Sequence, residues 1–544
     1  MITNLPNLGL FAAFAVIRFI YIMSESHKIA KAATTIGTGT LLSRILGFLR
    51  DMVIANFFGA GMAADAFFVA FRIPNLWRRL VGEGSLTISF IPVYTEYLTQ
   101  RSEEETRKVT HIAFTIGGVI LLILTVLGVL FSPVLIRIIA PGWFAEYPEK
   151  FQLTVTLNQI IFPYLFFMGL FALCMGILNS QRHFFAPAIA PIFLNISIIV
   201  SVLLFYHTFE IPVMTLALGV LAGGIIQFLF QIPFLRKKRI TFRFNFDFRH
   251  PAIKRIGLLM VPGLIGTAVY QINVFVDTIF ASFLPSGSVS YLFYADRLME
   301  FPLGIFAIAI GMASLPSLSA LVSQGKMEEF EETLSFTFRL TAFISIPAMV
   351  GLIALKTPII NLLFQRGVFD YGATEMTARA LFFYCVGLWA IAGARTVAPA
   401  FYSLQDTRTP LKIGLFCLGA NVVFIAILIH PLKHGGLALA TSLSSTLNLI
   451  LLFWKLNSKI GKIDIRKNIK SLLRDVFCSL PMGLAAYLIC SIGNWSTTGN
   501  IGEKVLLLLT GIVIGLGIYL ACSYWVKSEE MFFLLKMIRR RGKD

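Results

Sequence analysis

Charged residues are scarce in this chain. Asp, Glu, Lys and Arg together make up 14% of its 544 residues, whereas hydrophobic residues make up 57%. Soluble globular domains carry about 25% charged residues, so this composition excludes an ordinary soluble protein, and the mean hydropathy of +0.80 agrees with that exclusion. Because helices satisfy their own backbone hydrogen bonds inside a bilayer, we predict an all-α polytopic membrane protein.

Acidic residues are the rarer charged class. The chain has 28 Asp and Glu against 46 Lys and Arg, which gives a formal net charge of +18. In a soluble protein this excess would suggest a nucleic-acid partner. In a membrane protein the positive-inside rule explains it, because Lys and Arg concentrate in cytoplasmic loops. We therefore predict no nucleic-acid partner.

Patterns that indicate catalysis or metal binding are also missing. The six cysteines stand alone inside apolar runs, and the seven histidines are scattered without metal-ligand spacing. The sequence contains no GxxxxGK[ST] phosphate loop and no evident Ser/His/Asp grouping. We predict that the protein is not an enzyme and has no resident cofactor.

Long apolar windows are abundant instead. A membrane-spanning helix needs about 20 mostly apolar residues, and no hydrophilic stretch here is long enough for a soluble domain. Near the N-terminus, the apolar run from Leu10 to Met23 contains Arg18 and no signal-peptide cleavage site follows it, so a signal peptide, a marginal helix and an over-extended start stay open. We predict about fourteen transmembrane helices, over residues 30–56, 63–92, 109–140, 153–179, 185–207, 211–235, 255–283, 290–321, 333–364, 375–403, 410–430, 434–457, 472–493 and 502–526.

The basic loops predict the orientation. The densest basic segments are residues 236–255, residues 455–474 and the C-terminal KMIRRRGKD, and all three lie on one side if fourteen helices are counted. Both termini are therefore predicted to be cytoplasmic. An alternative role for these segments is contact with anionic lipid headgroups. The loops that are poor in Lys and Arg are 141–148, the turn at Glu210, 285–290 and 494–503.

The chain also repeats itself weakly. DMVIANFFGAG (residues 51–61) aligns without gaps with DTIFASFLPSG (residues 277–287) at an offset of 226 residues, and residues 179–187 resemble residues 403–410 at nearly that offset. Six predicted helices fit into each repeat, and an even number gives both repeats the same orientation. We predict two six-helix lobes that alternately expose a central site, followed by two additional helices. A static channel is the alternative, but no selectivity-filter motif is present.

This repeat predicts how the chain is organised. Residues 1–27 form an uncertain N-terminal extension, and 527–544 a cytoplasmic tail. The other predicted segments are the first lobe over 28–236, a basic cytoplasmic linker over 237–254, the second lobe over 255–457, a second basic linker over 458–471, and helices 13 and 14 over 472–526.

Ionisable residues cluster in the first two predicted helices. An ionised side chain at the bilayer centre costs about 2.5 kcal/mol or more, so such residues usually face a protein-lined cavity and have a function. Arginine outnumbers the acids, and guanidinium groups bind phosphate oxygens in a bidentate manner. We predict a site for phosphate or diphosphate. Its candidate residues are Arg44, Arg50, Asp65, Arg72, Arg78, Arg79 and Glu83.

Spacing places part of this cluster on one helix face. Asp65, Arg72 and Arg79 are seven residues apart, which stacks them with a drift of about 20° per step. Glu83 follows Arg79 at pairing distance. A structural interpretation stays open, because acid–base neighbours such as Arg79 with Glu83 and Arg50 with Asp51 can simply lock helices together.

The second repeat offers a matching arginine. Arg297 lies one position from the repeat equivalent of Arg72, since 72 + 226 = 298. One arginine from each lobe could then hold the oxygens of a diphosphate. Asp296 and Glu300 are expected to orient Arg297 or to balance its charge.

These segments resemble the MurJ (MviN) family of lipid II flippases, within the multidrug/oligosaccharidyl-lipid/polysaccharide exporter superfamily. The resemblance extends from about residue 28 to residue 526. The segments that carry it are SRILGFLRD (43–51), FGAGMAADAFFVAFRIPNLWRRL (58–80), EGS (83–85), SFLPSGSVS (282–290), YADRLMEFP (294–302) and APAFYSLQDTRTP (398–410).

The resemblance implies a flippase of the bacterial cytoplasmic membrane. It implies fourteen helices, a lipid-tail groove lined by the last two, and transfer of undecaprenyl-diphosphate-linked peptidoglycan precursor, lipid II, to the outer leaflet by alternating access. An exporter of another lipid-linked oligosaccharide is the first alternative, a multidrug or cation antiporter the second and a non-transport scaffold the last. Lipid II, membrane lipids and cell-wall synthesis proteins are the implied partners. The arginines implied to line the central cavity are Arg44, Arg50, Arg72, Arg78, Arg79 and Arg297.

The resemblance also raises the question of a coupling ion. Some members of the family are thought to couple to sodium through acids in helices 7 and 11, and Asp277 and Asp406 are similar in placement. Tyr402 stands one turn before Asp406, where the resemblance leads us to expect an amide. Membrane potential is the competing energy source.

Overall fold

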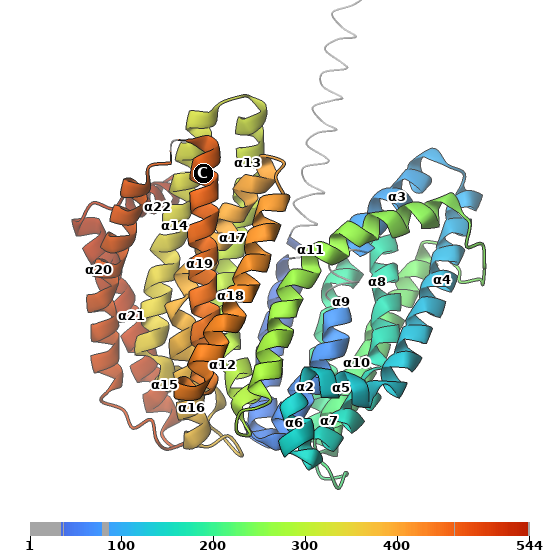
Figure 1. Cartoon of the computed structure of the whole chain (residues 1–544), viewed down its shortest axis with the longest axis horizontal. Coiled ribbons are helices and arrows are strands. Elements are labelled where there is room, and N and C mark those ends of the chain that lie inside the picture. Colours follow the sequence, from blue (N-terminus) through green and yellow to red (C-terminus); the bar gives the residue numbers. More distant parts are fainter. Residues whose placement is uncertain (1–33, 36, 79–85, 462, 542–544) are drawn as a thin grey trace, which may run out of the picture. The chain divides into compact units, whose positions relative to one another are not determined.

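The described chain is built from helices. The structure is a computed structural model and describes residues 34–35, 37–78, 86–461 and 463–541. Every regular element in these residues is a helix, which confirms the predicted all-α membrane class. The chain divides into two compact units, and each is described by itself (Figure 1).

Unit 1 contains most of the first half of the sequence. It consists of Met1–Asp51, Phe71–Ser132 and Leu157–Thr267. Residues 37–58 form a helix, and this helix continues past Asp51, the last residue of the first segment of unit 1. The helices that lie wholly in unit 1 are α3 (Leu86–Gln100), α4 (Glu103–Leu130), α8 (Tyr164–Ser180), α9 (Phe185–Phe205) and α10 (Met214–Lys237).

Unit 2 contains the second half together with two segments of the first. It consists of Met52–Ala70, Pro133–Thr156 and Ala268–Asp544. Besides the helix over residues 37–58, three helices have turns in both units: α2 (Met62–Trp77), α7 (Pro148–Ile161) and α11 (Pro251–Ala281). The other elements, with only the first residue of α5 outside unit 2, are α5 (Ser132–Ile139), α6 (Pro141–Glu146), α12 (Ser288–Pro302), the π-helical turn η2 (Leu303–Ala307), α13 (Ile308–Ser323), α14 (Met327–Ala354), α15 (Lys356–Phe364), α16 (Tyr371–Val386), α17 (Leu388–Ser403), α18 (Arg408–Leu432), α19 (His434–Ile460), α20 (Ile465–Cys490), α21 (Ile501–Trp525) and α22 (Glu529–Arg541).

Nine helical stretches in the described residues are long and apolar enough to cross a membrane, or ten if α16 and α17 form one span with a 43° bend. The number fourteen stays a prediction. Several predicted windows are divided in the structure, because a hydropathy window measures length and not backbone breaks. The window over 290–321, for example, contains the π-helical turn η2 directly after Pro302.

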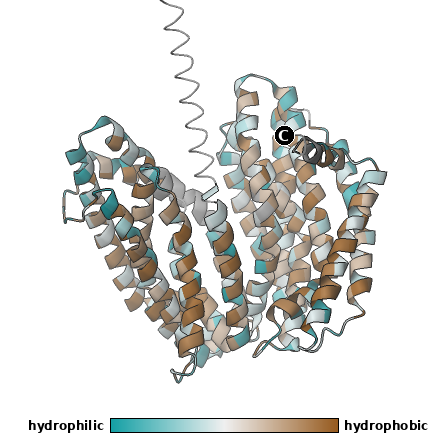
Figure 2. Ribbon diagram, turned by 180° about the vertical axis from the view of Figure 1, so that it is seen from behind, coloured by the Kyte–Doolittle hydropathy of each residue, from teal (hydrophilic) through white to brown (hydrophobic). Residues whose placement is uncertain are grey.

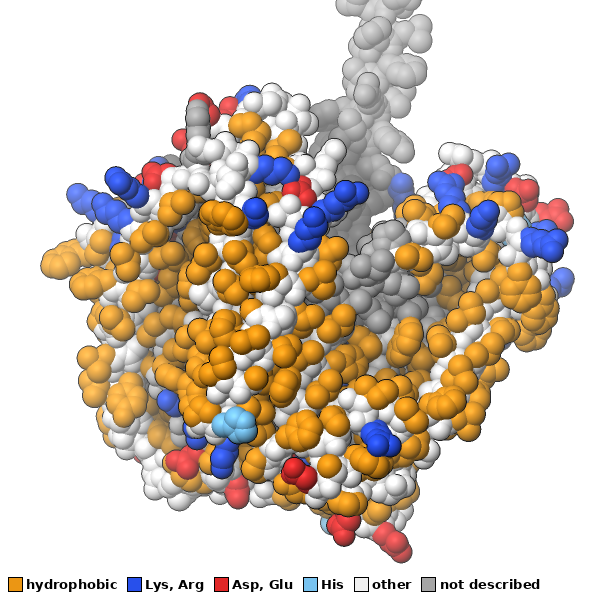
Figure 3. All heavy atoms as spheres, in the orientation of Figure 1, with side chains coloured by type: hydrophobic (Ala, Val, Ile, Leu, Met, Phe, Trp, Pro, Cys, Tyr) orange, Lys and Arg blue, Asp and Glu red, His pale blue; other side chains and the backbone are white. Residues whose placement is uncertain are grey.

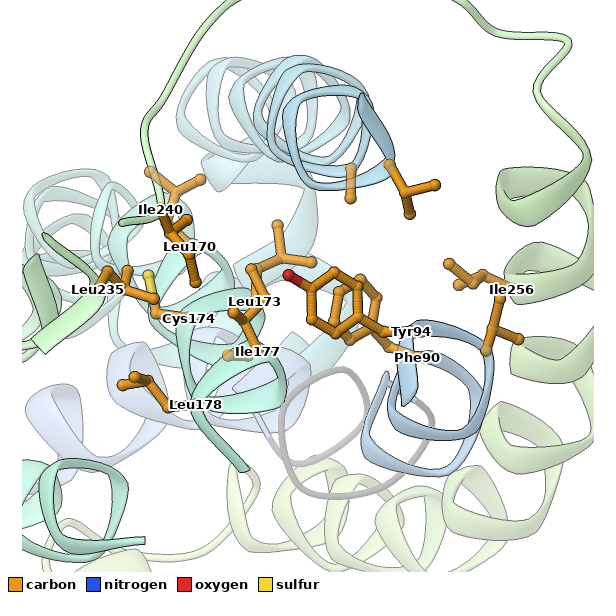
Figure 4. Close-up of a cluster of buried hydrophobic side chains, with 14 of the residues drawn as sticks. Phe90, Tyr94, Leu170, Leu173, Cys174, Ile177, Leu178, Leu235, Ile240 and Ile256 are labelled. Atoms are coloured by element: carbon orange, nitrogen blue, oxygen red, sulfur yellow. The ribbon is translucent and has the colours of Figure 1, made fainter. Parts of the chain in front are cut away.

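Unit 1 has a core of apolar side chains from several helices. Phe90 and Tyr94 of α3 stack at 5.1 Å between ring centroids and lie near Leu173 and Ile177 of α8 (Figure 4). The Tyr94 hydroxyl is hydrogen-bonded to Thr110 of α4 at 2.9 Å. This core holds α3, α4 and α8 together as one bundle.

The outer surface is apolar. Brown, hydrophobic residues dominate the middle of the helices in Figure 2, and teal, hydrophilic residues gather near their ends. Figure 3 shows the same distribution in space, with hydrophobic side chains over most of the described surface in view. On α20, exposed Leu473, Phe477, Leu480, Leu484 and Leu488 form one stripe at helical spacing. A membrane would cover such surfaces.

The last helices pack onto α14. A Cβ atom at Gly483 of α20 would lie 2.5 Å from Cγ1 of Val350 in α14, so a glycine is needed for this close approach. The segment predicted as a cytoplasmic tail contains the helix α22. Glu530 of α22 is buried and accepts hydrogen bonds from Arg339 of α14 at 2.9 Å and from Arg474 of α20. The end of the chain is therefore attached to the bundle.

Candidate functional site

The predicted site residues belong to both units. Unit 1 contains Arg44, Arg50, Arg72 and Arg78, whereas unit 2 contains Asp65 and Arg297. The predicted pairing of Arg72 with Arg297 therefore stays a prediction. Arg79 and Glu83, also predicted, lie outside the described residues.

Arg50 is held by a buried network in unit 1. Its Nε and Nη2 atoms donate to Oδ1 of Asp51 at 3.0 and 2.6 Å, and its Nη1 atom donates to Oδ1 of Asn195 in α9 at 3.1 Å. Asn195 in turn donates to the backbone carbonyl of Ser43 at 3.1 Å. Three of the five guanidinium donors are thus used within the protein. This network fixes the direction of Arg50 and ties residues 43–51 to α9.

The other unit 1 arginines are more accessible. Arg44 is exposed, and Arg72 and Arg78 are half-buried. Arg78 donates through Nε to Oδ1 of Asn75 at 2.8 Å. Guanidinium groups bind phosphate oxygens through charge-assisted, often bidentate hydrogen bonds.

Asp65 is the centre of a buried network in unit 2. Its Oδ2 atom accepts from Lys150 Nζ at 2.6 Å and from the backbone N–H of Gly287 at 2.7 Å. Its Oδ1 atom accepts from the backbone N–H and the hydroxyl of Ser290 at 2.8 and 2.6 Å. We call these four residues the Asp65 network. Asp65 therefore caps the N-terminus of α12, where a negative charge is favourable.

Lys150 is equally confined. Asp65 and Lys150 are both buried, and the Lys150 ammonium lies 4.2 Å from the centre of the Trp143 ring. Removing one partner of a buried ion pair typically costs 3–5 kcal/mol, because the other charge stays uncompensated. Asp65 and Lys150 depend on each other.

Further contacts in unit 2 join the same segments. Tyr294 of α12 donates to the carbonyl of Gly59 at 3.1 Å, and the backbone N–H of Val368 donates to the carbonyl of Asn56 at 2.9 Å. Gly287 has a φ of +97°, and a Cβ atom there would lie 2.5 Å from the carbonyl oxygen of Ala60. Together with the Asp65 network, these contacts form a seal between residues 52–70 of the first repeat and the second repeat.

Arg297 occupies the next turns of α12. Its guanidinium lies 5.4 Å from the centre of the Phe293 ring and 3.8 Å from the Glu300 carboxylate. Arg297 and Glu300 are each about one-third exposed. The weak ion pair agrees with the expectation that Glu300 balances the charge of Arg297, and the exposure leaves the guanidinium accessible to a ligand.

The two acids suggested for sodium have different surroundings. Asn421 of α18 donates from Nδ2 to Oδ1 of Asp277 at 3.1 Å and to Oδ1 of Asn273 at 3.0 Å, while its own buried Oδ1 has no hydrogen-bond partner. Carboxylate and amide oxygens are ligands that hard cations prefer. The residues around Asp277 therefore fit a cation.

Asp406 is already paired with a cation of the protein. Lys459 Nζ lies 2.6 Å from its Oδ2 atom, and Thr409 donates to it from its backbone N–H and its hydroxyl. The hydrogen bond from Lys459 holds the pKa of Asp406 well below its usual range. These donors occupy the positions that a bound ion would need, so the residues around Asp406 do not fit sodium.

Sequence reasoning missed Lys150 and Asn195. Lys150 lies in a region with little Lys or Arg, and its partner Asp65 is 85 residues away. Asn195 is a lone amide in the apolar helix α9. Both are isolated polar residues in apolar surroundings, and this is the signal that could have found them.

Comparisons with known proteins agree with these segments. A family model described as "Lipid II flippase MurJ" matches residues 54–509. The chain belongs to this family. A relative from Vibrio cholerae, named "Probable lipid II flippase MurJ", is 37% identical over 506 residues, covering 92% of this chain and 96% of the relative. A relative from Burkholderia cenocepacia, named "Lipid II flippase MurJ", is 36% identical over 433 residues, covering 79% and 84%.

Solved structures support the fold of this MurJ-family chain. The structure "Lipid II flippase MurJ, inward closed conformation" has a TM-score of 0.75 at 29% identity, covering 90% of this chain and 99% of that one. An inward-facing multidrug transporter of the MATE family has a TM-score of 0.64 at 16% identity, covering 79% and 98%. The second likeness concerns the fold alone and agrees with the predicted superfamily.

Proposed function

We propose that this membrane protein is a lipid II flippase of the bacterial cytoplasmic membrane, and that it works as a transporter and not as an enzyme. Membership in the MurJ family over residues 54–509 is the observation that carries the proposal. The substrate's charged headgroup cannot cross hydrocarbon unaided, because burial of unpaired charge is prohibitively costly. A protein that supplies cationic partners along the way removes this obstacle.

The arginines are the proposed ligands of the diphosphate. We assign this role to Arg44, Arg50, Arg72, Arg78, Arg79 and Arg297. The exposure of Arg44 and Arg297 supports it directly. Three of the five N–H donors of Arg50 bind Asp51 and Asn195, and these bonds would keep Arg50 in position. Its other donors would bind the diphosphate.

The acids have a different proposed role. The four donors around Asp65 saturate its oxygens, so we assign Asp65 to positioning of α12, the helix that carries Arg297. Glu83 keeps its predicted place near Arg79 as an untested expectation. If Asp65 has this role, its substitution changes the position of α12 and thereby the position of Arg297.

Alternating access gives the seal in unit 2 a function. Lobes that rock about a central site must break the contacts between the repeats at one end when that end opens. The loops at 141–148 and 285–290 are two of the four that are poor in Lys and Arg, and the positive-inside rule assigns such loops to the outer side. We therefore propose that the seal closes the outer end and opens during release of the substrate, with both chain termini in the cytoplasm.

The last two membrane helices are the proposed path of the polyprenyl tail. The exposed stripe of α20 offers an apolar surface along a whole helix. The tail would stay in contact with lipid and with α20 and α21 while only the headgroup enters the protein. Cell-wall synthesis proteins remain proposed partners.

A coupling ion is a secondary proposal. If sodium drives the cycle, Asp277 with Asn273 and Asn421 would hold it, and a cation there would compensate the carboxylate charge. Asp406 would keep its ion pair with Lys459 instead. Membrane potential is the alternative energy source.

Complementation tests the proposed function. A strain depleted of its own flippase should grow when it expresses this chain, and Arg297→Ala should abolish growth while expression stays normal. Arg101→Ala, which removes an exposed arginine after α3, is the matched control and should support growth. Full growth with Arg297→Ala would contradict the role given to Arg297.

Binding measurements test the substrate class. Purified protein should bind lipid II more tightly than other undecaprenyl-diphosphate sugars. Equal affinity for all of them would favour an exporter of another lipid-linked oligosaccharide.

A further inference from the structure

The segment that joins α10 to α11 has an unusual surface. Residues 241–247 contain no regular secondary structure, and phenylalanine stands at every second position from 242 to 248. All four phenylalanines are exposed, and Phe244 is 88% exposed. The residues between Phe244 and Phe248, Asn245 and Asp247, are half-buried. Phe244, Phe246 and Phe248 are therefore the most exposed apolar side chains of this segment. We call Phe242, Phe244, Phe246 and Phe248 the phenylalanine comb.

The inner side of this segment is attached to α4. The backbone N–H of Asn245 donates to Oγ1 of Thr115 at 2.9 Å, and Lys108 Nζ lies 3.2 Å from Oδ2 of Asp247. At the start of the comb, Phe242 packs edge-on against Phe114 at 4.6 Å between ring centroids. The segment therefore lies along α4 in unit 1 (Figure 1). Phe242 packs against this helix, whereas Phe244, Phe246 and Phe248 are more exposed.

The contacts on α4 set the depth of the comb. Lys108 is the last Lys, Arg, Asp or Glu of α4, and the helix is mostly apolar from Ile112 to Leu130. Thr115 lies seven residues beyond Lys108, which is about 10 Å along a helix. The comb is therefore level with the beginning of the apolar stretch of a membrane-spanning helix. At that level the neighbouring medium is the boundary between headgroups and acyl chains.

A cationic rim surrounds the comb. Residues 236–255 contain eight Lys or Arg and one acid, and that acid, Asp247, is paired with Lys108. All eight cations are exposed, including Arg243 and Arg249 on either side of Phe244 and Phe248. Four to eight Lys or Arg next to a span favour anionic lipids, each by electrostatic attraction to the headgroups.

We propose that the phenylalanine comb is a lipid-binding wedge. Its rings insert into the headgroup boundary of the leaflet, and Arg243 and Arg249 bind the anionic headgroups beside them. Apolar burial and charge attraction together are the two components of binding at a membrane interface. The wedge holds the linker between the two repeats at the membrane surface. This inference is independent of the transported substrate.

Fluorescence quenching tests the insertion. The full chain carrying Cys522→Ala and Phe244→Cys is labelled with an environment-sensitive probe, since the five other cysteines are buried. It is reconstituted into vesicles of phosphatidylethanolamine and phosphatidylglycerol. Lipids brominated on their acyl chains should quench the probe strongly. A probe at Gln324→Cys, an exposed turn between α13 and α14, is the matched control and should emit as in water.

Comparison of two quenchers tests the choice of lipid. Brominated phosphatidylglycerol should quench the probe at position 244 more than the same amount of brominated phosphatidylcholine. Arg243→Gln with Arg249→Gln should remove this difference. Arg466→Gln with Lys470→Gln, an equal loss of charge in the other basic linker, should preserve it.

Three results would overturn the proposal. The first is a probe at position 244 that emits as in water and that neither lipid quenches. The second is equal quenching by both lipids in the parent protein. The third is shielding of the probe in native membranes but not in vesicles of pure lipid, which would identify the occupant of the comb as another protein.

Discussion

Single buried charged residues hold the contacts between the repeats in unit 2, and Lys150 is the clearest example. It neutralises Asp65 in a region from which water is excluded, and Asp65 in turn caps α12. The sequence pointed to Asp65 through its place on the face of Arg72 and Arg79. It did not point to Lys150, because helical spacing relates residues within one element only. Partners 85 residues apart depend on the tertiary fold.

Removal of Lys150 should be costly. Lys150→Met leaves Asp65 buried without its counter-ion, and we expect a loss of about 3–5 kcal/mol in the free energy of unfolding. Thermal unfolding of the purified protein measures this loss. Adding Asp65→Asn to Lys150→Met should recover a large part of the lost stability, because neither buried side chain is then charged. Glu149→Gln is the control at an exposed neighbour. Unchanged unfolding of Lys150→Met would show that the pair contributes nothing.

At the scale of elements, α22 is the clearest case of a helix that no apolar window predicts. Its residues lie in the segment predicted as a cytoplasmic tail, after the last apolar window. The structure places Glu530 at 1% exposure between Arg339 and Arg474, whereas the adjacent Glu529 is 57% exposed. A hydropathy window cannot find such a helix, because one buried carboxylate and a few apolar contacts attach it.

The two glutamates of α22 offer a matched pair of variants. Glu530→Gln leaves two arginines without their buried partner and should lower the free energy of unfolding by at least about 2 kcal/mol. Glu529→Gln should have an effect below about 1 kcal/mol, because exposed ion pairs contribute little. Similar effects of both variants in thermal unfolding would contradict this role of Glu530.

The same pair predicts a pH dependence. Burial raises the pKa of Glu530, but its own backbone N–H, Ser528, Arg474 and Arg339 outweigh burial, so the pKa lies below its ordinary value. The stabilisation is therefore complete above the ordinary carboxyl pKa of about 4.3 and is lost as the pH falls through the lowered value. The difference between the parent and Glu530→Gln should shrink at acid pH. A difference that is constant with pH would contradict the lowered pKa.

At the scale of elements the sequence predicted long apolar helices better than their interruptions. Apolar length is a local property, so windows such as 185–207 correspond closely to α9. Interruptions depend on particular residues in context, as at Pro302 before η2 or at Gly387 between α16 and α17. The arginine-rich segments could be found because a charged residue inside an apolar window is recognisable from the sequence alone.

At the scale of the whole molecule, the seal in unit 2 is the feature that alternating access must change. Residues 52–70 belong to the first repeat but are attached to α12 and to the segment around Val368. The repeat was visible in the sequence, whereas these contacts between its halves were not. Some of these contacts join backbone groups, as in the hydrogen bond from Val368 to Asn56, and every residue has such groups, so side-chain patterns do not predict them.

A cross-link through the seal should stop transport. A backbone hydrogen bond joins Asn56 and Val368 across the seal, and we expect a disulfide between cysteines at these two positions to hold the seal closed. The double variant Asn56→Cys with Val368→Cys should lose complementation under oxidising conditions and regain it with a reductant. The two single variants are the controls and should be insensitive to oxidation. Transport by the cross-linked protein would contradict opening at this seal.

The central claim concerns the movement of a lipid-linked diphosphate from one leaflet to the other. The most direct measurement is the accessibility of lipid II in the outer leaflet of cells that are depleted of their own flippase. We expect that the parent chain restores accessibility and that Arg297→Ala, at equal expression, does not. Absence of outer-leaflet lipid II with the parent chain, or its full restoration by Arg297→Ala, would contradict the proposed function.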